Sequence, residues 1–536
     1  MDTLKTNTVG SLPSFAAKKF QNHTALYFQG KRWTYKDFLN EVDQVARGLI
    51  AIGVNPGDKV ALWMVNRPEW LFTMYAVAKI GAVLVPLNTR YRTMDVSYTV
   101  KNSDSVVWIF QAKSGPVDYF DMVRDNLNKA KDKTDISQNF PKLRKIVVFG
   151  AKPDLGMLSW DDMIHRGKKI TETTLMIRSD SVNPKDTFII AYTSGTTGNP
   201  KGVMHKHNLI KMTLDRISRL GMKKTDINIT SLPLFHLYAY GEAIACLLTG
   251  SCQVLTETFN AAENLDLIQE EKATIIHGFD THYKDMLDEQ ERKPRDISSL
   301  RFGTFPSGAP SSIEIAYRTQ KELVQTVSGW GMTETWTFAT VSSPNDTIEQ
   351  RCEASGRPMP GVKIKIIDPN TGISKPRGEQ GELIVQSYMN MQGYYNNEVE
   401  TNKTIGRDGW LRTGDTAIYR DDGHVRFLGR FKDMLKVGGE NVSPLEVEAF
   451  LLKIPSISQI AIVGVPDERL NEVPAAFVVS DIEQTVTLKE IKSYCQDVIA
   501  SYKIPRYLFY LDSLPMTPTG KVQKHKLRQK ALDSLS

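Results

Sequence analysis

The chain has 536 residues, of which 41% are hydrophobic and 24% are charged. This composition is ordinary for a folded globular protein and excludes collagen, coiled coil and wholesale disorder. The 67 basic and 61 acidic residues leave a formal net charge of +6, a mild excess that suits anionic small ligands, and we expect no nucleic-acid partner.

The length predicts three or four packed units, or one large α/β domain with a smaller one. The cysteines of the protein are isolated in the sequence: Cys246, Cys252, Cys352 and Cys495. Since none forms a CxxC pair or a Cys/His cluster, we expect no disulfide framework and a reducing cytoplasm. No basic segment followed by an apolar run opens the chain, so we expect no secretory signal. Residues 73–87 form the longest apolar stretch, which is too short to span a bilayer and is interrupted by Lys79.

The first part of the chain alternates helix and strand signals. Residues 33–50 and 70–80 have helical apolar spacing, and Thr34 is suited to cap the first helix. Short apolar strands are predicted at 60–65, 82–87, 106–110 and 146–149. Because strands alternate with helices, we expect parallel βαβ units. The polar segment 113–141 predicts a surface excursion.

A second series of strands begins near Thr187. Its predicted strands are 188–192, 254–255, 274–277, 302–305 and 324–327, and each ends in a cluster of Gly, Ser or Thr. In open α/β sheets, ligands bind at the carboxyl ends of the strands. We therefore expect the functional residues in these clusters.

The pattern changes after about residue 360. Segments 362–367 and 382–385 predict an antiparallel or barrel-like subdomain. The end of the chain predicts a compact α+β set, with helices at 444–452 and 488–499 and strands at 459–465 and 475–479. We expect a large α/β domain at 1–430, rich in parallel sheet, and a small α+β domain at 431–536.

The most distinctive segment, residues 192–202, reads Tyr-Thr-Ser-Gly-Thr-Thr-Gly-Asn-Pro-Lys-Gly and follows an apolar strand. Its hydroxyl and backbone N–H groups, with Lys201, are suited to wrap a polyphosphate. It is not a Walker A loop, because Lys201 is not flanked as Gly-Lys-Ser/Thr.

This loop resembles the phosphate loop of the adenylate-forming superfamily, which includes acyl-CoA synthetases, peptide-synthetase adenylation domains and firefly luciferase. Four more motifs follow in the order of that family: Gly-Trp-Gly-Met-Thr-Glu at 329–334, Gly-Trp-Leu-Arg-Thr-Gly-Asp at 409–415, Gly-Arg-Phe-Lys-Asp at 429–433 and Pro-Thr-Gly-Lys at 518–521. The resemblance covers nearly the whole chain, from about 33 to 528. It implies an acyl-CoA synthetase (carboxylate–CoA ligase) that uses ATP, Mg²⁺ and coenzyme A.

The resemblance assigns roles around the nucleotide. Trp330, where most relatives have Tyr, would stack on adenine. Thr333 would donate to the α-phosphate, and Glu334 would hold Mg²⁺. Asp415 would accept from the ribose hydroxyls, and Arg430 would bond the ribose or brace Asp415. Further nucleotide contacts are implied at Thr193, Ser194, Gly195, Thr196, Thr197, Gly198, Lys201, Ser307, Gly308, Ala309, Pro310, Gly329, Gly331 and Met332, with Thr196 also a metal contact.

The small domain contributes three further sites by resemblance. Lys521 would bridge the substrate carboxylate and the α-phosphate. Lys432 would be the hinge on which the mobile small domain turns between the half-reactions. Gly438 and Gly439 would then line the path of the thiol, although a plain hairpin explains them equally.

The acyl site is implied beside His236, which would act as a gate. The other predicted acyl-site residues are Tyr238, Gly278, Phe279, Thr304, Ser307, Gly331, Met332 and Trp336. Three bulky rings among them favour a compact pocket for a short- or medium-chain acid or a small cyclic or aromatic one. Asp280 and His282 fit either a charged or hydroxylated tail or a helix cap.

Three alternatives to a CoA ligase stay open at this point. The chain could load a separate carrier protein, oxidise its adenylate as luciferase does, or bind ATP without ligase chemistry. A homodimer is an open alternative to a monomer.

Overall fold

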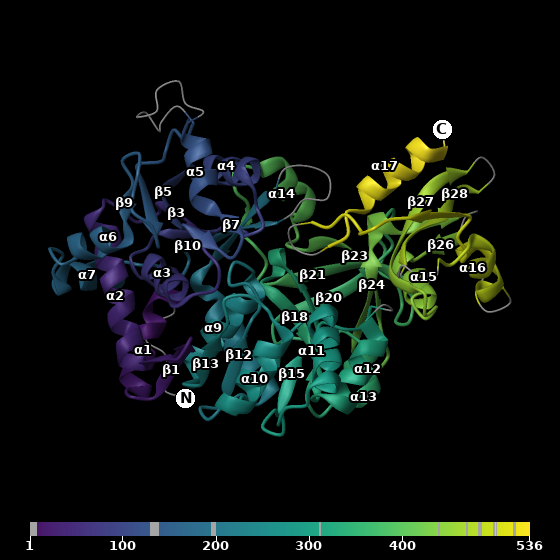
Figure 1. Ribbon diagram of the computed structural model, residues 1–536, viewed down its shortest axis with the longest axis horizontal. Coiled ribbons are helices and arrows are strands. Elements are labelled where there is room, and N and C mark those ends of the chain that lie inside the picture. Colours follow the sequence, from purple (N-terminus) through teal and green to yellow (C-terminus); the bar gives the residue numbers. More distant parts are fainter. Residues whose placement is uncertain are drawn as a thin grey trace.

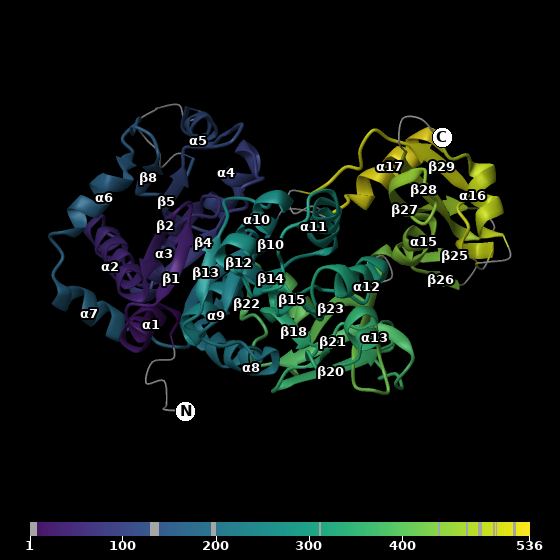
Figure 2. The same ribbon diagram turned by 60° about the horizontal axis from the view of Figure 1, so that its bottom comes forward.

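Two large sheets form the centre of the protein, and a smaller body is attached at the C-terminal end (Figures 1 and 2). The computed structural model describes residues 8–128, 139–193, 200–309, 312–437, 440–467, 470–480, 485–496, 499, 501–517 and 521–535. Within these ranges, no helix combines the length and the apolar character needed to cross a membrane.

The first sheet has eight strands in the order β22-β11-β10-β4-β3-β5-β8-β9. Their bounds are β3 (Lys59–Trp63), β4 (Val83–Pro86), β5 (Ser105–Gln111), β8 (Lys145–Phe149), β9 (Leu158–Ser159), β10 (Thr187–Thr193), β11 (Lys201–Lys206) and β22 (Gly393–Tyr394). All seven residues of β5 are buried, which explains its continuous apolar sequence. β10 pairs in parallel with β4, so the strand that opens the second predicted series belongs to the first sheet.

The first two predicted helices are present as α2 (Tyr35–Ala51) and α3 (Pro68–Lys79). The expected cap is confirmed, since the Thr34 hydroxyl accepts a hydrogen bond from the Asp37 N–H. Lys79, which interrupts the apolar stretch, is buried and forms an ion pair with Asp43 of α2. A charged residue is therefore tolerated here because its partner comes from the neighbouring helix.

The prediction of a surface excursion over 113–141 is wrong in part. This segment contains α5 (Tyr119–Asn128), whose Tyr119, Val123 and Leu127 are buried in one of the hydrophobic cores, as is Phe140. Residues spaced by four share one face of a helix. The polar composition of the segment concealed this apolar face.

The second sheet has seven strands in the order β16-β15-β14-β12-β13-β1-β2. Their bounds are β1 (Thr24–Phe28), β2 (Lys31–Thr34), β12 (Ile227–Thr230), β13 (Cys252–Leu255), β14 (Ile275–His277), β15 (Phe302–Thr304) and β16 (Thr326–Val327). Every pairing is parallel except β1 with β2. The carboxyl ends of β12, β14 and β15 therefore share one edge of this sheet.

Helices surround the two sheets (Figures 1 and 2). They are α1 (Leu12–Phe20), α4 (Thr93–Asn102), α6 (Trp160–Gly167), α7 (Glu172–Asp180), α8 (Ile210–Leu220), α9 (Leu237–Thr249), α10 (Ala261–Glu271), α11 (Asp280–Arg292), α12 (Ile313–Glu322), α13 (Ile348–Glu353) and α14 (Glu398–Thr404).

Two antiparallel sheets follow, and the second of them was predicted from the change in sequence pattern after about residue 360. One consists of β17 (Gly329–Met332), β18 (Thr337–Val341) and β19 (Arg357–Pro358), and the other of β20 (Val362–Ile367), β21 (Gln380–Ser387), β23 (Leu411–Tyr419) and β24 (Val425–Arg430). The pairings within both sheets are antiparallel.

In its described residues, the small body has a five-stranded sheet and three α-helices. Its elements are β25 (Leu435–Val437), β26 (Glu440–Val442), α15 (Pro444–Leu451), β27 (Ile457–Asp467), β28 (Asn471–Ser480), α16 (Leu488–Cys495), β29 (Tyr507–Tyr510) and α17 (Lys524–Leu535). The predicted fold class, a large α/β domain followed by a small α+β one, is confirmed. The boundary at residue 430 stays a prediction.

Candidate active site

The Gly-Trp-Gly-Met-Thr-Glu motif forms the first strand of the β17/β18 hairpin and the turn that follows it. β18 approaches the motif so closely that positions 329 and 331 have room only for glycine. A Cβ atom on Gly331 would lie 1.4 Å from the Thr337 carbonyl oxygen, and one on Gly329 would lie 2.6 Å from that of Thr340. Any larger residue at either position would push the hairpin apart.

The turn after this motif has an uncommon backbone. Trp336 and Thr337 have φ angles of 56° and 61°, in the left-handed region that non-glycine residues rarely adopt. Arg216 of α8 holds this turn, since its Nη2 donates to the carbonyl oxygens of Trp336 and Phe338, at 2.7 Å each. Burial lowers the pKa of Arg216 to about 10. A buried cation therefore stabilises the turn that presents Glu334.

Glu334 itself is buried and tied to a distant strand. Its Oε1 accepts a hydrogen bond of 2.9 Å from the Tyr394 hydroxyl of β22. The carbonyl oxygen of Thr333 accepts from His205 Nε2 at 2.7 Å. Burial lowers the pKa of His205 to about 4, so this ring is neutral near pH 7. Tyr394 and His205 thus fix a predicted metal ligand and its neighbour.

Asp415 and Trp330 come together, although they lie far apart in the sequence. The Trp330 indole Nε1 donates to Asp415 Oδ2 at 2.9 Å, and Arg430 Nε lies 3.0 Å from Asp415 Oδ1. The Asp415 side chain is only 5% exposed. Its burial raises the pKa of Asp415, and the Arg430 guanidinium opposes that rise. Of the two roles predicted for Arg430, bracing Asp415 matches this contact.

Lys521 reaches this group from the small domain. The segment before α17, yellow in Figures 1 and 2, extends back toward the large domain. The Lys521 side chain is exposed, but desolvation by the surrounding protein, with the Arg430 charge, lowers its pKa. The carboxylates of Asp415 and Glu334 oppose that shift, which places Lys521 within electrostatic reach of both. The adjoining 518–520 lie outside the described residues.

The ends of the predicted phosphate loop belong to a hairpin formed by β10 and β11. Its centre, Ser194, Gly195, Thr196, Thr197 and Gly198, lies outside the described residues, and the Thr193 hydroxyl donates to the Lys201 carbonyl oxygen at 3.4 Å. Lys201 Nζ lies 2.6 Å from Glu400 Oε2 and 5.0 Å from the centre of the Tyr394 ring. Lys201 and Lys403 lower the pKa of Glu400 to about 2. Lys201 is therefore paired in this structure, and its phosphate role stays a prediction.

Ser307 and Gly308 follow β15 in a buried loop. The Ser307 hydroxyl donates to the Arg351 carbonyl oxygen at 2.8 Å. Gly308 has φ +105°, and a Cβ atom there would lie 2.4 Å from Ser355 Oγ. Ala309 ends this described stretch, and Pro310 lies outside it. The Ser307 hydroxyl is thus used within the protein.

The predicted hinge residue, Lys432, lies in the short 3₁₀ turn Phe431–Asp433 between the last strand of the large domain and the first of the small one. Gly438 and Gly439 lie outside the described residues. The hinge and thiol-path roles therefore stay predictions.

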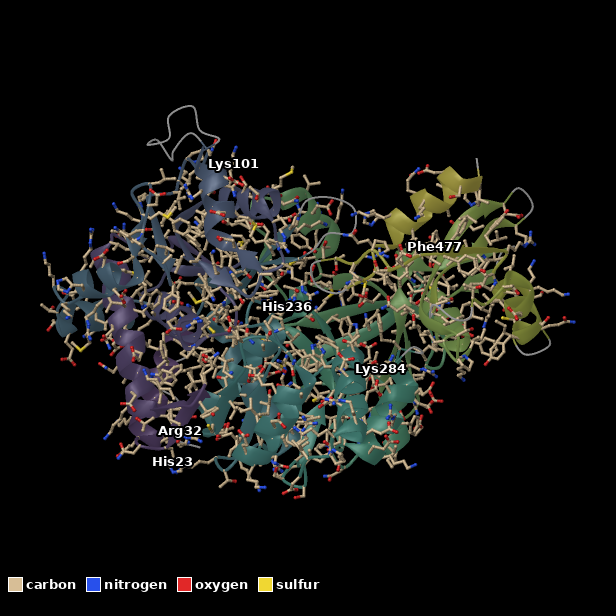
Figure 3. The ribbon with its side chains drawn as sticks, in the orientation of Figure 1. His23, Arg32, Lys101, His236, Lys284 and Phe477 are labelled. Atoms are coloured by element: carbon tan, nitrogen blue, oxygen red, sulfur yellow. The ribbon has the colours of Figure 1, made fainter. Side chains whose placement is uncertain are left out.

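On the acyl side, His236 precedes α9 near the middle of the molecule (Figure 3). Desolvation, with the nearby cations Lys521 and Arg90, lowers the pKa of His236 to about 4. Tyr238 lies two positions further along the chain. The centre of its ring is 5.6 Å from that of Phe279 and 4.9 Å from that of Phe338. The hydroxyl of Tyr238 is hydrogen-bonded to Thr304. These contacts bring three of the predicted acyl-site residues, Tyr238, Phe279 and Thr304, into one cluster.

Four other residues predicted on the acyl side have structural partners. His282 Nδ1 accepts from the Phe279 N–H at 3.2 Å, so it caps α11, as one of the two predicted readings proposed. Trp336 is 0% exposed and packs against Phe188, His205 and Tyr240. Met332 packs against the same hydrophobic core from its edge, and a Cβ atom on Gly278 would lie 3.1 Å from the Tyr283 ring.

Several residues that hold the site carry no sequence motif. Arg216, His205 and Tyr394 are separated from the motif they support by 60 to 128 positions. Each is a single residue of a common type, so nothing in the sequence pattern distinguishes it. Only the three-dimensional contacts identify them.

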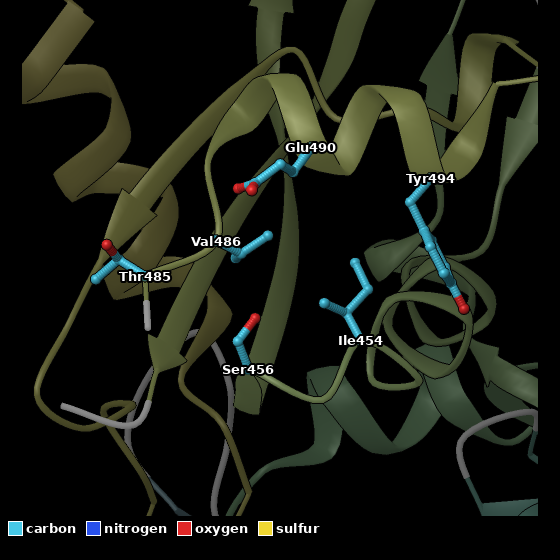
Figure 4. Close-up of a pocket in the computed structure, with 6 residues that line it drawn as sticks. All are labelled: Ile454, Ser456, Thr485, Val486, Glu490 and Tyr494. Carbon is cyan, nitrogen blue, oxygen red and sulfur yellow. The ribbon is translucent and has the colours of Figure 1, made fainter. Parts of the chain in front are cut away.

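A separate pocket of about 470 Å³ lies on the small domain (Figure 4). Its lining residues are Ile454, Ser456, Thr485, Val486, Glu490 and Tyr494. The Glu490 carboxylate is already used to cap α16 through Thr487. A second pocket of about 480 Å³, which includes Arg67 and Gln111, lies at the carboxyl ends of β5 and β8. Neither pocket includes a predicted site residue.

Comparison with known proteins gives a consistent result. A family model described as "AMP-binding enzyme" matches residues 14–395, and one described as "AMP-binding enzyme C-terminal domain" matches 446–521. The chain is 35% identical to a putative acyl-CoA synthetase, YngI, of Bacillus subtilis, covering 98% of this chain and 97% of that protein. It is 32% identical to the mouse medium-chain acyl-CoA ligase ACSF2, mitochondrial, covering 98% and 88%.

Solved structures agree on the fold. The anthranilate CoA ligase AuaEII, solved with anthranoyl-AMP, superposes with a TM-score of 0.86 at 28% identity, covering 98% of both chains. An o-succinylbenzoate CoA synthetase of Bacillus subtilis superposes with a TM-score of 0.81 at 24% identity, covering 97% of this chain and 98% of that one.

Proposed function

The chain belongs to the AMP-binding enzyme family, and we propose that it joins a carboxylic acid to coenzyme A through an acyl-adenylate. Its class, an AMP-forming acid–thiol ligase, agrees with its relatives. The observation that carries the proposal is the convergence of Asp415, Arg430 and Glu334 of the large domain with Lys521 of the small domain. These two cations and two carboxylates are close enough to influence one another electrostatically.

In the first half-reaction, a carboxylate oxygen of the acid attacks the α-phosphorus of ATP. The bond to the β-phosphate oxygen breaks, and pyrophosphate leaves. Asp415 would hold the ribose, and Trp330 would face the adenine. Lys521 would contact the carboxylate and the α-phosphate oxygen together, since an ammonium group suits a point contact between two anions. The carboxylate is ionised at pH 7 and needs no general base, so His236, neutral at that pH, would act as a gate.

For the metal, Glu334 is a suitable single ligand. Only one of its oxygens accepts from Tyr394, and Mg²⁺ is usually bound by one or two carboxylates plus phosphate oxygens. Within the described residues, no cluster of three or more His, Cys, Asp or Glu side chains could hold a metal without the nucleotide. When bound, Mg²⁺ would neutralise charge on the phosphates. Thr196 stays the second predicted contact.

In the second half-reaction, the thiol of coenzyme A attacks the carbonyl carbon of the adenylate. The carbon–oxygen bond to AMP breaks, and the thiol proton is lost to solvent. We place the rotation of the small domain at Lys432, with residues 1–430 and 431–536 as the two domains. Gly438 and Gly439 would then line the path of the thiol.

The acyl pocket would lie around His236, Tyr238, Phe279 and Thr304. Its aromatic residues support a short- or medium-chain acid or a small aromatic acid. Relatives named for medium-chain acids and for anthranilate support both choices. We propose a reducing compartment, the cytosol, because all four cysteines are free. The homodimer stays a prediction.

The test is a pyrophosphate-release assay across a panel of carboxylic acids, followed by AMP release with coenzyme A or with a phosphopantetheinyl carrier protein as the thiol. We expect pyrophosphate release to require an acid, and the thioester to form with coenzyme A. Thioester formation with the carrier protein alone would replace this proposal by carrier loading. Failure of every acid to release pyrophosphate would contradict the ligase chemistry itself.

A further inference from the structure

A second polar cluster lies on the acyl side, deeper than the residues that the motifs identify. Tyr238 and Glu242 are one turn apart on α9, His277 ends β14, and Thr304 ends β15. All of them lie at the edge of the second sheet where its parallel strands end. This edge is where open α/β sheets bind ligands.

Hydrogen bonds connect three of these side chains in series: His277, Thr304 and Tyr238. His277 Nδ1 lies 2.7 Å from the Thr304 hydroxyl oxygen, and that hydroxyl also bonds the hydroxyl of Tyr238. Tyr283 donates to the Thr304 carbonyl oxygen at 3.0 Å. Glu242 Oε1 lies 3.6 Å from His277 Nδ1, too far for a normal hydrogen bond.

At Glu242 and His277, this cluster has unpaired polar atoms. Both carboxyl oxygens of Glu242 and Nε2 of His277 are buried without a hydrogen bond of normal geometry, although the Thr230 hydroxyl is close enough to interact with the Glu242 carboxyl group. Each residue is only 6% exposed. An unsatisfied buried polar group costs about 1–3 kcal/mol. Such groups are retained where something else pairs with them.

Burial disfavours the charged form of both groups. Burial raises the pKa of Glu242 well above its ordinary value, although the Thr230 hydroxyl partly opposes this. Burial also lowers the pKa of His277 to about 3. A neutral carboxylic acid beside a neutral imidazole offers both donors and acceptors. It suits an uncharged hydroxyl or amino group better than an ion.

We propose that the acid used by this protein carries a hydroxyl or amino group on its tail, and that this group pairs with Glu242 and His277. The inference rests on the proposed ligase function. Tyr238 connects the buried pair to Phe279. The centre of its ring lies 6.1 Å from that of His277 and 5.6 Å from that of Phe279. Phe279 is 41% exposed. A purely aliphatic tail would leave three polar atoms unpaired. Of the two alternatives given for Asp280 and His282, His282 fits the helix cap, so we assign the polar contact to Glu242 and His277 instead.

The test compares acids of matched shape that differ in one polar group. Suitable pairs are benzoate with 2-aminobenzoate and with each hydroxybenzoate, and hexanoate or octanoate with its ω-hydroxy and 3-hydroxy forms. The measurement is kcat/KM for acid-dependent pyrophosphate release by the wild type, Glu242→Gln and Glu242→Leu. Sites built to bond a substrate hydroxyl reject the analogue that lacks it by large factors. We expect at least one polar acid to exceed its apolar partner by about 10²-fold or more.

The variants test whether Glu242 is responsible. Glu242→Leu should reduce the preference for the polar acid at least about tenfold while it keeps or raises activity on the apolar partner. If Glu242→Leu does not fold, Glu242→Gln, which keeps the shape, gives the same comparison with a smaller change. Asn228→Leu is the control, since it removes a buried polar side chain from β12 whose amide nitrogen donates to the Ser251 hydroxyl. It should leave the preference unchanged.

The failures can be told apart. A wild type that prefers the apolar acid in every pair would overturn this inference and leave the ligase function intact. The same preference in wild type and both Glu242 variants, or an equal change in Asn228→Leu, would also overturn it. If no acid supports pyrophosphate release, the proposed function fails first.

Discussion

The nucleotide side and the acyl side of the candidate site differ in how their polar groups are paired. On the nucleotide side, Asp415 has both Trp330 and Arg430 as partners, and Glu334 has Tyr394. On the acyl side, Glu242 and His277 keep unpaired atoms in a buried setting. On the nucleotide side each carboxylate has at least one partner from the protein, although Asp415 Oδ1 has only the ion pair with Arg430. On the acyl side both oxygens of Glu242 lack a hydrogen bond of normal geometry.

This difference follows from what each side has to recognise. ATP is the same molecule for every member of the family, so the residues around it can be fixed in advance by the protein. Preorganised groups of this kind stabilise a transition state without further rearrangement. The acid differs between members, and its recognition falls to residues outside the shared motifs. We therefore expect substitutions on the nucleotide side to change rate, and those on the acyl side to change substrate choice.

The largest effect should come from Lys521→Ala. Loss of the cation that we propose to bridge the carboxylate and the α-phosphate should slow adenylate formation by about 10²–10³-fold or more. Thioester formation from a preformed adenylate should fall much less. The two half-reactions are measured separately, by pyrophosphate release and by AMP release from added acyl-AMP. Lys526→Ala, at an exposed position of the same helix region, is the control. Equal loss in both half-reactions would contradict the assigned role.

Lys432→Pro should separate the half-reactions in the opposite way. Proline fixes φ and removes the backbone N–H, so rotation at this turn would be blocked. We expect pyrophosphate release to continue while CoA-dependent turnover falls by about 10²-fold or more. Lys432→Ala keeps the backbone free and should retain both activities. Full thioester synthesis by the proline variant would show that the domain does not turn here.

Trp330→Phe tests the pairing on the nucleotide side. It keeps an aromatic face but removes the donor to Asp415. Hydrogen bonds to charged groups contribute about 1.5–3 kcal/mol, so KM for ATP should rise by about tenfold or more. If Trp330 acts through Asp415, the same change should cost little in an Asp415→Asn background. Additive losses would instead indicate that only the stacking face matters. Trp410→Phe is the control.

The residues that we assign to the nucleotide side could be selected from the sequence because they lie in short local strings. Glu334, Asp415 and Lys521 each belong to a motif that can be read without the fold. Their partners are different: Tyr394 and Arg216 are single residues, 60 and 120 positions from the groups they hold. A contact of that kind depends on strand order, which local patterns do not specify.

The acyl side was predicted in outline and missed in detail. Tyr238, Phe279 and Thr304 were expected together and do lie together. Glu242 was missed because a glutamate on a helix is normally solvent-exposed. The amphipathic face of α5 was missed for the converse reason, since its buried residues are diluted by polar neighbours.

Trp336 lies between the two sides, and Trp336→Gly should affect stability as well as specificity. Removing a fully buried indole typically costs about 3–5 kcal/mol. Glycine at φ 56° should recover about 1 kcal/mol by relieving backbone strain. We expect the free energy of unfolding, measured in urea, to fall by about 2–4 kcal/mol. If the ring also limits the pocket, the acid chain length with the highest kcat/KM should increase. Trp336→Phe should lose much less. A wild-type optimum at palmitate, or no shift in the variant, would leave Tyr238 and Phe279 as the limiting residues.

The smallest effect concerns pH and distinguishes the acyl side again. Burial lowers the pKa of His277 to about 3 and that of His205 to about 4, whereas an unfolded histidine titrates near 6.5. Between these values the unfolded chain binds more protons than the folded one, so stability falls as pH drops below about 6.5. At pH 5 each such residue should cost about 2 kcal/mol. Urea unfolding of wild type and His277→Gln at pH 7.5 and 5.0 measures this loss. The variant should lose less stability on acidification than the wild type, and His525→Gln, at an exposed position, should lose as much. An equal pH dependence in His277→Gln would show that burial does not disfavour the charged form of this histidine, which would contradict the uncharged partner proposed for it.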